Sequence, residues 1–366
     1  MNKLNHGPFL HDQPDVLGVL LTNLGTPDSD SRRDVRRYLK EFLWDPRVVE
    51  MWRPLWWLVL NGIILNTRPS RSAKAYKKIW TEEGSPLLVF GRRQQRALQD
   101  LLDRRSEFPV RVALAMRYGN PSIASGLEEL RQAGARRLLV LPLYPQYSAT
   151  TTASTFDAVT KVLRGWRWIP ESRFVNHYHD DPDYIGALAA SVRAFWEIHR
   201  QPEKLVFSFH GIPEDYFHAG DPYYCECQKT GRLLAEALEL PADRWVLTFQ
   251  SRLGPKQWLQ PYTDKTLSAL AASGVKRVHV VCPGFSTDCL ETLEEVAMEN
   301  REIFLAAGGT DYEYIPCLNA EASHIEMMSG LVCRHTRDWM PVRGAAERDR
   351  ERHDCRHRAM ALGAPG

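Results

Sequence analysis

The chain has 366 residues, of which 44% are hydrophobic and 25% charged, and its formal net charge is +2. This length favours two domains over one, and so small a net charge argues against nucleic acid as the main partner. The N-terminus, MNKLNHGPFLHDQPDV, lacks the apolar core of a signal peptide, and no run approaches the roughly 20 apolar residues that span a bilayer, so we expect a cytoplasmic protein.

Six apolar runs of strand length follow one another along the chain, with helical patterns such as IASGLEELRQAG and YTDKTLSALAASG between them. The runs cover residues 15–27, 110–121, 136–148, 204–213, 244–255 and 276–288. Continuous apolar strands that alternate with helices indicate parallel sheets covered on both faces. We therefore predict an α/β fold.

Between the first two runs lies MWRPLWWLVLNGIIL, residues 51–65, in which eleven of fifteen residues are apolar. The segment could form a buried helix. It could also form an exposed apolar lip over residues 51–66, suited to a membrane surface and to a greasy substrate. We favour the lip, in which Trp56 and Trp57 would be exposed and their replacement would leave stability unchanged.

The second half of the chain repeats the first. Three pairs of segments align in the same order: VLLTNLGTP (19–27) with LVFSFHGIP (205–213), RYGNP (117–121) more loosely with SRLGP (251–255), and LEELRQAGARRLLVLPLYPQYSATTT (127–152) with LSALAASGVKRVHVVCPGFSTDCLET (267–292). The last pair aligns without a gap at an offset of 140, which is 267 minus 127. The repeat predicts two related lobes with the same order of elements.

We expect two Rossmann-like lobes, residues 1–165 and 166–335, each a parallel sheet flanked by helices. Ligands of such folds bind beyond the carboxyl ends of the strands, so a cleft between the lobes should be lined by the loops that follow the strands. The remaining segment, 336–366, is highly charged and aperiodic, and we expect it to be disordered from about residue 340.

The segment VCPGFSTDCLETLEEV, residues 281–296, follows the last strand of the second lobe. In the simplest interpretation Thr287-Asp288 caps a helix, and Glu291 and Glu295, four residues apart, share its solvent-exposed face. Glu294 would lie off that face. Whether these carboxylates belong to a functional site depends on the other residues of the lobe.

His210 ends another strand of the same lobe, so it should meet Glu291 at the cleft. A neutral imidazole nitrogen and a carboxylate oxygen suit Fe(II) or a similar divalent ion, and the pair can also move protons near neutral pH. The repeat places Leu24 and Thr151 at the corresponding positions of the first lobe, where neither side chain can ionise. We therefore expect the metal site in the second lobe alone.

Four motifs closely resemble those of ferrochelatases, the enzymes that insert ferrous iron into protoporphyrin IX: YPQYSATTT (144–152), SFHGIP (208–213), FQSRLGPKQW (249–258) and CPGFSTDCLETLEE (282–295). The resemblance runs from about Gly18 to about Cys333. It implies that Fe(II) and protoporphyrin IX are the substrates, that protohaem is the product, and that no cofactor is tightly bound. The matching histidine and first glutamate are the family's iron-binding and catalytic pair, here His210 and Glu291, and Glu295 extends a carboxylate path.

The resemblance also implies a porphyrin pocket. The positions that match pocket residues of the family are Leu24, Arg117, Tyr118, Tyr144, Ser148, Trp258 and Asp288. A pocket that holds the macrocycle bent would expose its nitrogen lone pairs. His210 would then take a proton, while Glu291 with Glu295 would receive protons or pass iron, and which residue performs which step stays open. The family places a pocket lip at 51–66, which would give peripheral contact with the inner face of the membrane.

Some relatives carry a [2Fe–2S] cluster, in one arrangement bound by a C-terminal cysteine trio and a cysteine in the YPQYS loop. Here that loop position is Ala149, and after residue 320 only Cys333 and Cys355 remain. A cluster needs four thiolates within reach, and Cys225 with Cys227 does not obviously complete a set. We expect no [2Fe–2S] cluster.

Three other functions are compatible with parts of this pattern. A cobalt-type tetrapyrrole chelatase could share the two lobes and the metal pair. A porphyrin or haem carrier would need an axial ligand but no acidic path, so Glu291 with Glu295 argues against it. A two-lobed solute-binding protein is opposed by the absence of an export signal.

Overall fold

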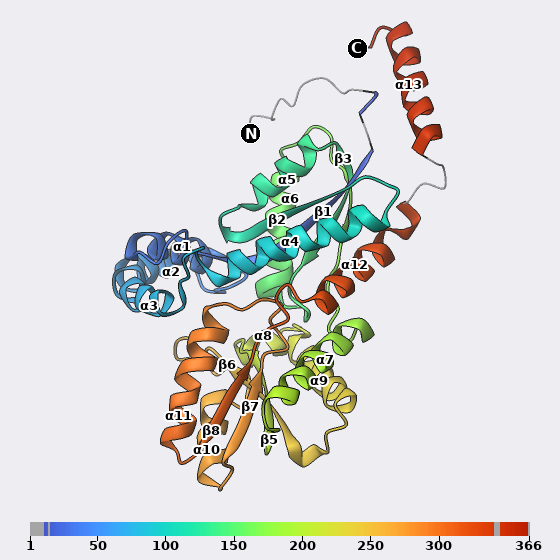
Figure 1. Ribbon diagram of the computed structural model, residues 1–366. Coiled ribbons are helices and arrows are strands. Elements are labelled where there is room, and N and C mark those ends of the chain that lie inside the picture. Colours follow the sequence, from blue (N-terminus) through green and yellow to red (C-terminus); the bar gives the residue numbers. More distant parts are fainter. Residues whose placement is uncertain (1–10, 14, 340–344, 365–366) are drawn as a thin grey trace.

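The computed structural model describes residues 11–13, 15–339 and 345–364, which form two α/β lobes (Figure 1). Each lobe has a four-stranded parallel sheet, in the orders β2-β1-β3-β4 and β6-β5-β7-β8. The strands are β1 (Val16–Thr26), β2 (Val110–Gly119), β3 (Ala135–Pro142), β4 (Glu171–Phe174), β5 (Lys204–His210), β6 (Trp245–Gln250), β7 (Arg277–Val281) and β8 (Asp311–Ile315). The two orders correspond strand by strand, which confirms the predicted pair of related parallel sheets.

Helices connect the strands and cover the faces of both sheets. In the first lobe they are α1 (Arg32–Trp44), α2 (Arg53–Val59), η1 (Leu60–Ile64), α3 (Leu65–Ile79), α4 (Pro86–Arg105), α5 (Ile123–Gln132), η2 (Ala149–Ala153) and α6 (Ser154–Leu163). After β4 they are α7 (Pro182–Ile198), α8 (Glu214–His218), α9 (Tyr223–Ala237), η3 (Ala242–Arg244), α10 (Thr263–Ala272), η4 (Glu291–Glu299), α11 (Asn300–Ala306), α12 (Ala322–Thr336), η5 (Arg337–Trp339) and α13 (Ala345–Ala361). Three of them, η1, η2 and η4, are π-helical.

The repeat extends to details of the loops, with one correction. In the gapless alignment of residues 127–152 with 267–292, η2 aligns with the start of η4. Both are π-helices that follow the third strand of their lobe. After the second strand, the amide of Met116 donates to the carbonyl of Pro121 (2.6 Å), and that of Phe249 donates to the carbonyl of Pro261 (2.8 Å). Pro261 is therefore the counterpart of Pro121, and the loose alignment of RYGNP with SRLGP is wrong. Phe249 and Pro261 are twelve positions apart, whereas Met116 and Pro121 are five apart. The loop after β6 is therefore seven residues longer than the loop after β2.

The edge strands β4 and β8 were not among the predicted runs, because they have only four and five residues and read ESRF and DYEYI. β4 pairs with β3. The first sheet therefore ends at Phe174, and the boundary expected at residue 165 lies before the last strand of the first lobe.

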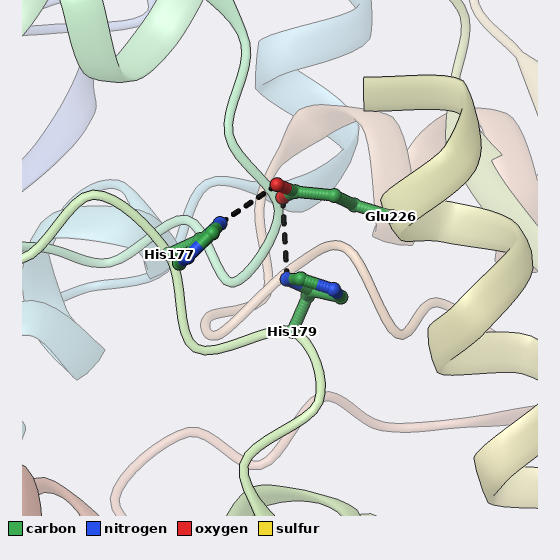
Figure 2. A group of neighbouring side chains, drawn as sticks. All are labelled: His177, His179 and Glu226. Carbon is green, nitrogen blue, oxygen red and sulfur yellow. Dashed lines mark hydrogen bonds and ion pairs between the residues drawn. The ribbon is translucent and has the colours of Figure 1, made fainter. Parts of the chain in front are cut away.

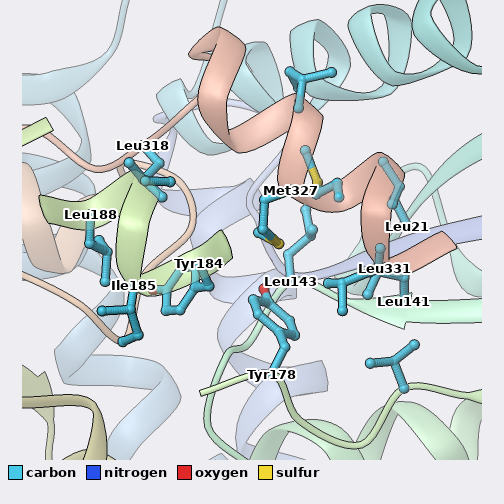
Figure 3. Close-up of a cluster of buried hydrophobic side chains, with 14 of the residues drawn as sticks. Leu21, Leu141, Leu143, Tyr178, Tyr184, Ile185, Leu188, Leu318, Met327 and Leu331 are labelled. Atoms are coloured by element: carbon cyan, nitrogen blue, oxygen red, sulfur yellow. The ribbon is translucent and has the colours of Figure 1, made fainter. Parts of the chain in front are cut away.

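One apolar core runs through both lobes. It combines β1, β2 and β3 of the first lobe with β5 and β6 of the second, and α7 and α12 contribute to it. Figure 3 shows a part of this core in which Tyr184 of α7 lies beside Met327 of α12. α12 packs on α4 as well as on α7, so the helix before the C-terminal tail ties the second lobe back to the first.

The segment 51–66 forms α2, η1 and the start of α3, within the α1–α3 region (residues 32–79), which lies to one side of both sheets (Figure 1). The adjacent tryptophans Trp56 and Trp57 differ in burial. Trp57 is 53% exposed, whereas Trp56 is 5% exposed and its indole N–H donates to the carbonyl of Leu43 (2.7 Å). The lip prediction is therefore wrong for Trp56, because a helix with one exposed apolar face also has a face packed on the core.

The tail was predicted to be disordered, but residues 345–361 form the helix α13; residues 340–344 lie outside the described residues. Its sequence, AAERDRERHDCRHRAMA, is rich in strong helix formers. Arg352 also pairs with Asp349 one turn away, and Arg356 pairs with Asp12 near the N-terminus. Helix propensity and ion pairs therefore stabilise this segment despite the lack of an apolar stripe. Among all described residues, no helix is long and apolar enough to span a membrane.

Candidate active site

His210 is the last residue of β5 and pairs with Gln250, the last residue of β6. The next residue must be small, because a Cβ at Gly211 would lie 2.9 Å from the carbonyl oxygen of Gln250. The imidazole Nδ1 of His210 lies 2.6 Å from the carbonyl oxygen of Gly211. A carbonyl can only accept a hydrogen bond, so Nδ1 carries a proton, and the lone pair of the neutral imidazole is on Nε2. That nitrogen can bind a metal ion or accept a proton.

Glu291 begins the π-helix η4. Its carbonyl oxygen accepts a hydrogen bond from the side-chain amide of Gln250 (3.2 Å). Since Gln250 also pairs with His210, the end of β5, the end of β6 and the start of η4 meet at this residue. The structure thus brings the two predicted residues, His210 and Glu291, to the same carboxyl edge of the second sheet. The expected Thr287-Asp288 cap is absent, since η4 has Leu290 at its N-cap and no side-chain capping bond.

Glu295 lies one π-helical turn beyond Glu291 and is anchored to the residue after β6. Both carboxylate oxygens accept from Ser251, one from its amide (2.8 Å) and one from its hydroxyl. Burial raises the pKa of Glu295 to about 7; the two bonds from Ser251 oppose this shift, and the negative charge of Glu291 adds to it. Glu295 can therefore take up and release a proton near neutral pH.

The α1–α3 region covers Glu291 from the first lobe, because α3 packs directly on η4. The charge of Glu291 acts on two buried phenols, Tyr38 and Tyr76, whose pKa values are raised mainly by burial and further by this carboxylate. Burial lowers the pKa of Arg68, and the charge of Glu291 opposes that shift. The Nη1 atom of Arg68 is buried without a hydrogen-bond partner. A cation and two phenols are therefore close enough to Glu291 for its charge to act on them.

The side chain of Leu24, the counterpart of His210, packs against an apolar cluster built mainly from α1, α2 and α3. Leu290 and Leu293, which flank Glu291, pack against the same cluster. The residue before Leu24, Asn23, donates to the hydroxyl of Thr287 in the loop after β7 (3.5 Å). The carboxyl ends of β1 and β7 are thus in contact, so loops of the two lobes meet here.

Arg117 and Tyr118 belong to a buried polar network around Asp45. The hydroxyl of Tyr118 donates to Asp45 (2.8 Å), and Arg117 forms an ion pair with the same carboxylate. Although burial opposes its ionisation, hydrogen bonds from Ser154, the Arg47 amide and Tyr118, with the charge of Arg117, lower the pKa of Asp45. Tyr118 has no exposed surface, so of this pair only Arg117 can reach a ligand.

Two other predicted pocket residues are buried and hold loops in place. Ser148 is the N-cap of η2, accepts from the amide of Thr150 and donates to Asp221 (3.0 Å). Asp288 accepts from the hydroxyl of Tyr314 (2.6 Å) and the side-chain amide of Asn319 (2.6 Å). Both side chains are at most 3% exposed, so the structure assigns them positioning roles rather than contact with a ligand.

Tyr144 and Trp258 are only partly buried. The hydroxyl of Tyr144 is buried without a hydrogen-bond partner. Trp258 closes the long loop after β6, where its indole N–H donates to the carbonyl of Leu253 (3.0 Å) and its backbone pairs with Pro213, three residues after His210. Trp258 is therefore tied to the loop that carries the histidine.

Several residues of the site were missed from the sequence. Gln250 and Ser251 stand in the FQSRLGPKQW motif, yet their role as the junction of His210, Glu291 and Glu295 depends on strand pairing. Glu294 was expected to lie off the face of Glu291 and Glu295 and to matter little, but it is 7% exposed and pairs with Lys78 of α3 (2.5 Å). It thus helps to hold the α1–α3 region on η4.

Comparisons with known proteins identify relatives of this chain. A family model described as Ferrochelatase matches residues 16–336. The protein named Ferrochelatase from Thioalkalivibrio sulfidiphilus is 57% identical over 359 residues, which cover 97% of each chain, and that from Nitrosococcus oceani is 53% identical over 369 residues, which cover 100% of each. Among solved structures, SirB from Bacillus subtilis with Fe³⁺ is similar with a TM-score of 0.50 at 13% identity, over 86% of this chain and 94% of that one. That likeness concerns the fold.

Proposed function

Because the chain belongs to the ferrochelatase family, we propose that it inserts Fe(II) into protoporphyrin IX to form protohaem, the last step of haem biosynthesis. The observation that carries this proposal is that His210, Glu291 and Glu295 all meet the end of β6: His210 by strand pairing with Gln250, Glu291 through its backbone carbonyl, and Glu295 through its carboxylate on Ser251. Metal insertion releases two pyrrole protons and needs a partly desolvated metal ion. A site with a free imidazole nitrogen and a carboxyl of pKa about 7 can serve both needs.

The geometry supports distinct roles for the three side chains. His210 accepts a pyrrole proton at Nε2, and the resulting positive charge is stabilised by the Gly211 carbonyl at Nδ1. Glu291 presents a carboxylate oxygen to the incoming iron beside His210. Glu295 carries a proton away, since its pKa of about 7 allows it to exchange with solvent at neutral pH. Incomplete protein ligation favours turnover, because a full set of ligands would retain the iron.

For the porphyrin, we propose contacts with the four partly buried pocket residues, Leu24, Arg117, Tyr144 and Trp258. Tyr118, Ser148 and Asp288 act through the loops and strands that they hold. Apolar contact over a large flat ligand would supply most of the binding energy. The unpaired hydroxyl of Tyr144 would then gain a partner from a polar group of the ligand.

We also propose that the α1–α3 region touches a membrane surface, so that the protein is cytoplasmic and peripheral to the inner face of the membrane. The exposed large apolar side chains there are Trp44, Met51, Trp52, Leu55, Trp57, Leu58 and Ile63. They lie at the end of α1, just before α2, and on α2 and η1, and such a patch suits the bilayer interface. Contact there would place the porphyrin site beside the phase in which this poorly soluble substrate accumulates.

The test is turnover of the purified protein without air. Protoporphyrin fluorescence should disappear when Fe(II) or Zn(II) is added, and the absorption bands of the metalloporphyrin should appear. Glu236→Gln, which changes an exposed glutamate paired with Arg232 on α9, is the matched control for Glu291→Gln. Porphyrin binding without metal insertion would mean a carrier, and insertion of Co(II) into a different tetrapyrrole alone would mean a cobalt-type chelatase.

A further inference from the structure

A second group of metal-binding side chains lies outside the proposed active site. His177 and His179 lie two residues apart in the segment between β4 and α7. Tyr178 between them points the other way and shares a hydrogen bond with Ser286 (3.0 Å). Both imidazoles face Glu226, in the first turn of α9 (Figure 2).

The three side chains converge on a small volume. Nδ1 of His177 lies 2.7 Å from one oxygen of Glu226, and Nδ1 of His179 lies 3.3 Å from the other. The possible ligand atoms all lie within 4.8 Å of one another, and in the part of the chain that the structure describes no other three His, Cys, Asp or Glu side chains do so. Glu226 is 7% exposed, so the carboxylate is fixed at the centre of the group.

His179 gives an independent reason to expect a ligand. Its side chain is 6% exposed, and its Nδ1 is buried without a hydrogen-bond partner although it points at Glu226. A buried polar atom without a partner is rare in native proteins. An ion between the imidazoles and the carboxylate would provide that partner.

We propose that His177, His179 and Glu226 bind a divalent transition metal ion of the Zn²⁺ type, through Nδ1 of each histidine and a carboxylate oxygen. Two imidazoles with one carboxylate are a common ligand set for such ions. Ligand atoms about 2.1 Å from a tetrahedral ion lie about 3.4 Å apart, close to the 3.3 Å between His179 and Glu226. His177, whose side chain is 51% exposed, can move outward to widen the shorter contact.

The residues around the three side chains allow solvent to reach the site, and their charges do not repel a cation. A surface cavity of about 430 Å³ opens beside His177, whose side chain is 51% exposed, so solvent reaches this histidine. The nearest other charges, Asp180 and Lys229, pair with each other (2.5 Å), so Glu226 leaves a net negative charge at the site. The fourth coordination position would then be filled by water from the side of His177.

A bound ion would join the two lobes. One oxygen of Glu226 also accepts from the amide of Tyr147 (2.7 Å), in the YPQYS loop that follows β3. The histidines follow β4 of the first sheet, whereas Glu226 belongs to α9 of the second lobe. The ion would therefore hold the segment after β4, the loop after β3 and α9 together, and we infer a structural site rather than a second catalytic one.

The test uses full-length protein with His210→Ala and Glu291→Gln, so that the proposed substrate site cannot contribute. After chelator treatment, this protein should bind one Zn²⁺ per chain in equilibrium dialysis, Co²⁺ should show the visible bands of a site with nitrogen ligands, and Zn²⁺ should raise the melting temperature. Adding His177→Ala, His179→Ala or Glu226→Gln should weaken Zn²⁺ binding at least about 100-fold, since loss of a mere supporting contact already costs about 10–100-fold.

His218→Ala is the matched control, because this histidine is exposed and only approaches Glu214 (3.7 Å); it should leave Zn²⁺ binding unchanged. The exposed His177 keeps the test valid if the buried variants fold poorly. The proposal fails if the parent protein binds no stoichiometric Zn²⁺, or if His177→Ala and Glu226→Gln bind it as tightly as the control. Neither result depends on chelatase activity, so the proposed function is tested separately.

Discussion

Replacing Glu295 by glutamine tests the proposed proton path at the carboxyl group whose pKa is raised. Burial holds the pKa of Glu295 at about 7, well above its ordinary value of 4.5, although Ser251 donates two hydrogen bonds to the carboxylate. The folded state therefore binds this proton more tightly than the unfolded state does. The stability that the protonated carboxyl contributes is fully present below about pH 4.5 and is lost as the pH rises through about 7. Glutamine stays neutral and has no such loss.

The size of the effect follows from the shift. The interval from 4.5 to about 7 is about 2.5 pH units, and each unit corresponds to about 1.4 kcal/mol. The free energy of unfolding of the wild-type protein should therefore fall by up to about 3 kcal/mol relative to Glu295→Gln between acidic and slightly alkaline pH. Glutamine can still accept from the amide of Ser251, so the fold around η4 should be retained.

Urea unfolding of both proteins at about pH 5 and at about pH 8 measures this difference, since all other titrating groups are shared and cancel. Glu236→Gln, on the exposed face of α9, should run parallel to the wild type. The reasoning would be refuted if Glu295→Gln also ran parallel to the wild type, because the carboxyl of Glu295 would then titrate as it does in the unfolded chain. In the metallation assay, Glu295→Gln should lower turnover and remove a pH dependence centred near 7.

His210→Ala and Glu291→Gln should each lower metal insertion by about 10²–10⁴-fold while fluorescence quenching shows that protoporphyrin still binds; near-normal turnover in either variant would contradict their roles. Trp56→Ala should lower the free energy of unfolding by about 3–5 kcal/mol, whereas Trp57→Ala should change stability little and weaken binding to lipid vesicles; equal effects on stability would mean that both are core residues. The isolated protein should be colourless, since Ala149 and the sparse C-terminal cysteines predict no iron–sulfur cluster; visible absorption with about two irons per chain would disprove this.

The sheets could be predicted because the signals are local. Continuous apolar runs marked six of the eight strands, and the gapless repeat fixed the common order of the two lobes. The placement of His210 and Glu291 at one sheet edge followed from that order alone, since parallel strands end at the same edge. The edge strands were missed because β4 and β8 are short and half polar.

The predictions that failed are those that depend on the direction in which a side chain points. Trp56 and Trp57 are neighbours in sequence, and helix geometry sends one into the core and the other into solvent. Ser148 and Asp288 stand in the recognisable motifs, but they bond to Asp221 and Asn319 inside the protein. The cluster of His177 and Glu226 joins residues 49 positions apart (226 minus 177), and no short motif links them.

The core shared by both lobes limits how the protein can move. Buried side chains of both sheets pack in one cluster, whereas the α1–α3 region packs through its own separate cluster. A hinge between the lobes would have to break the shared core, which costs far more than a shift of peripheral helices. We therefore expect the lobes to stay together as one rigid frame, and a flat substrate to gain access when α1–α3 swings away from η4. The exposed lip and the gate would then be one and the same element, so that insertion into a lipid surface could also decide when the gate opens.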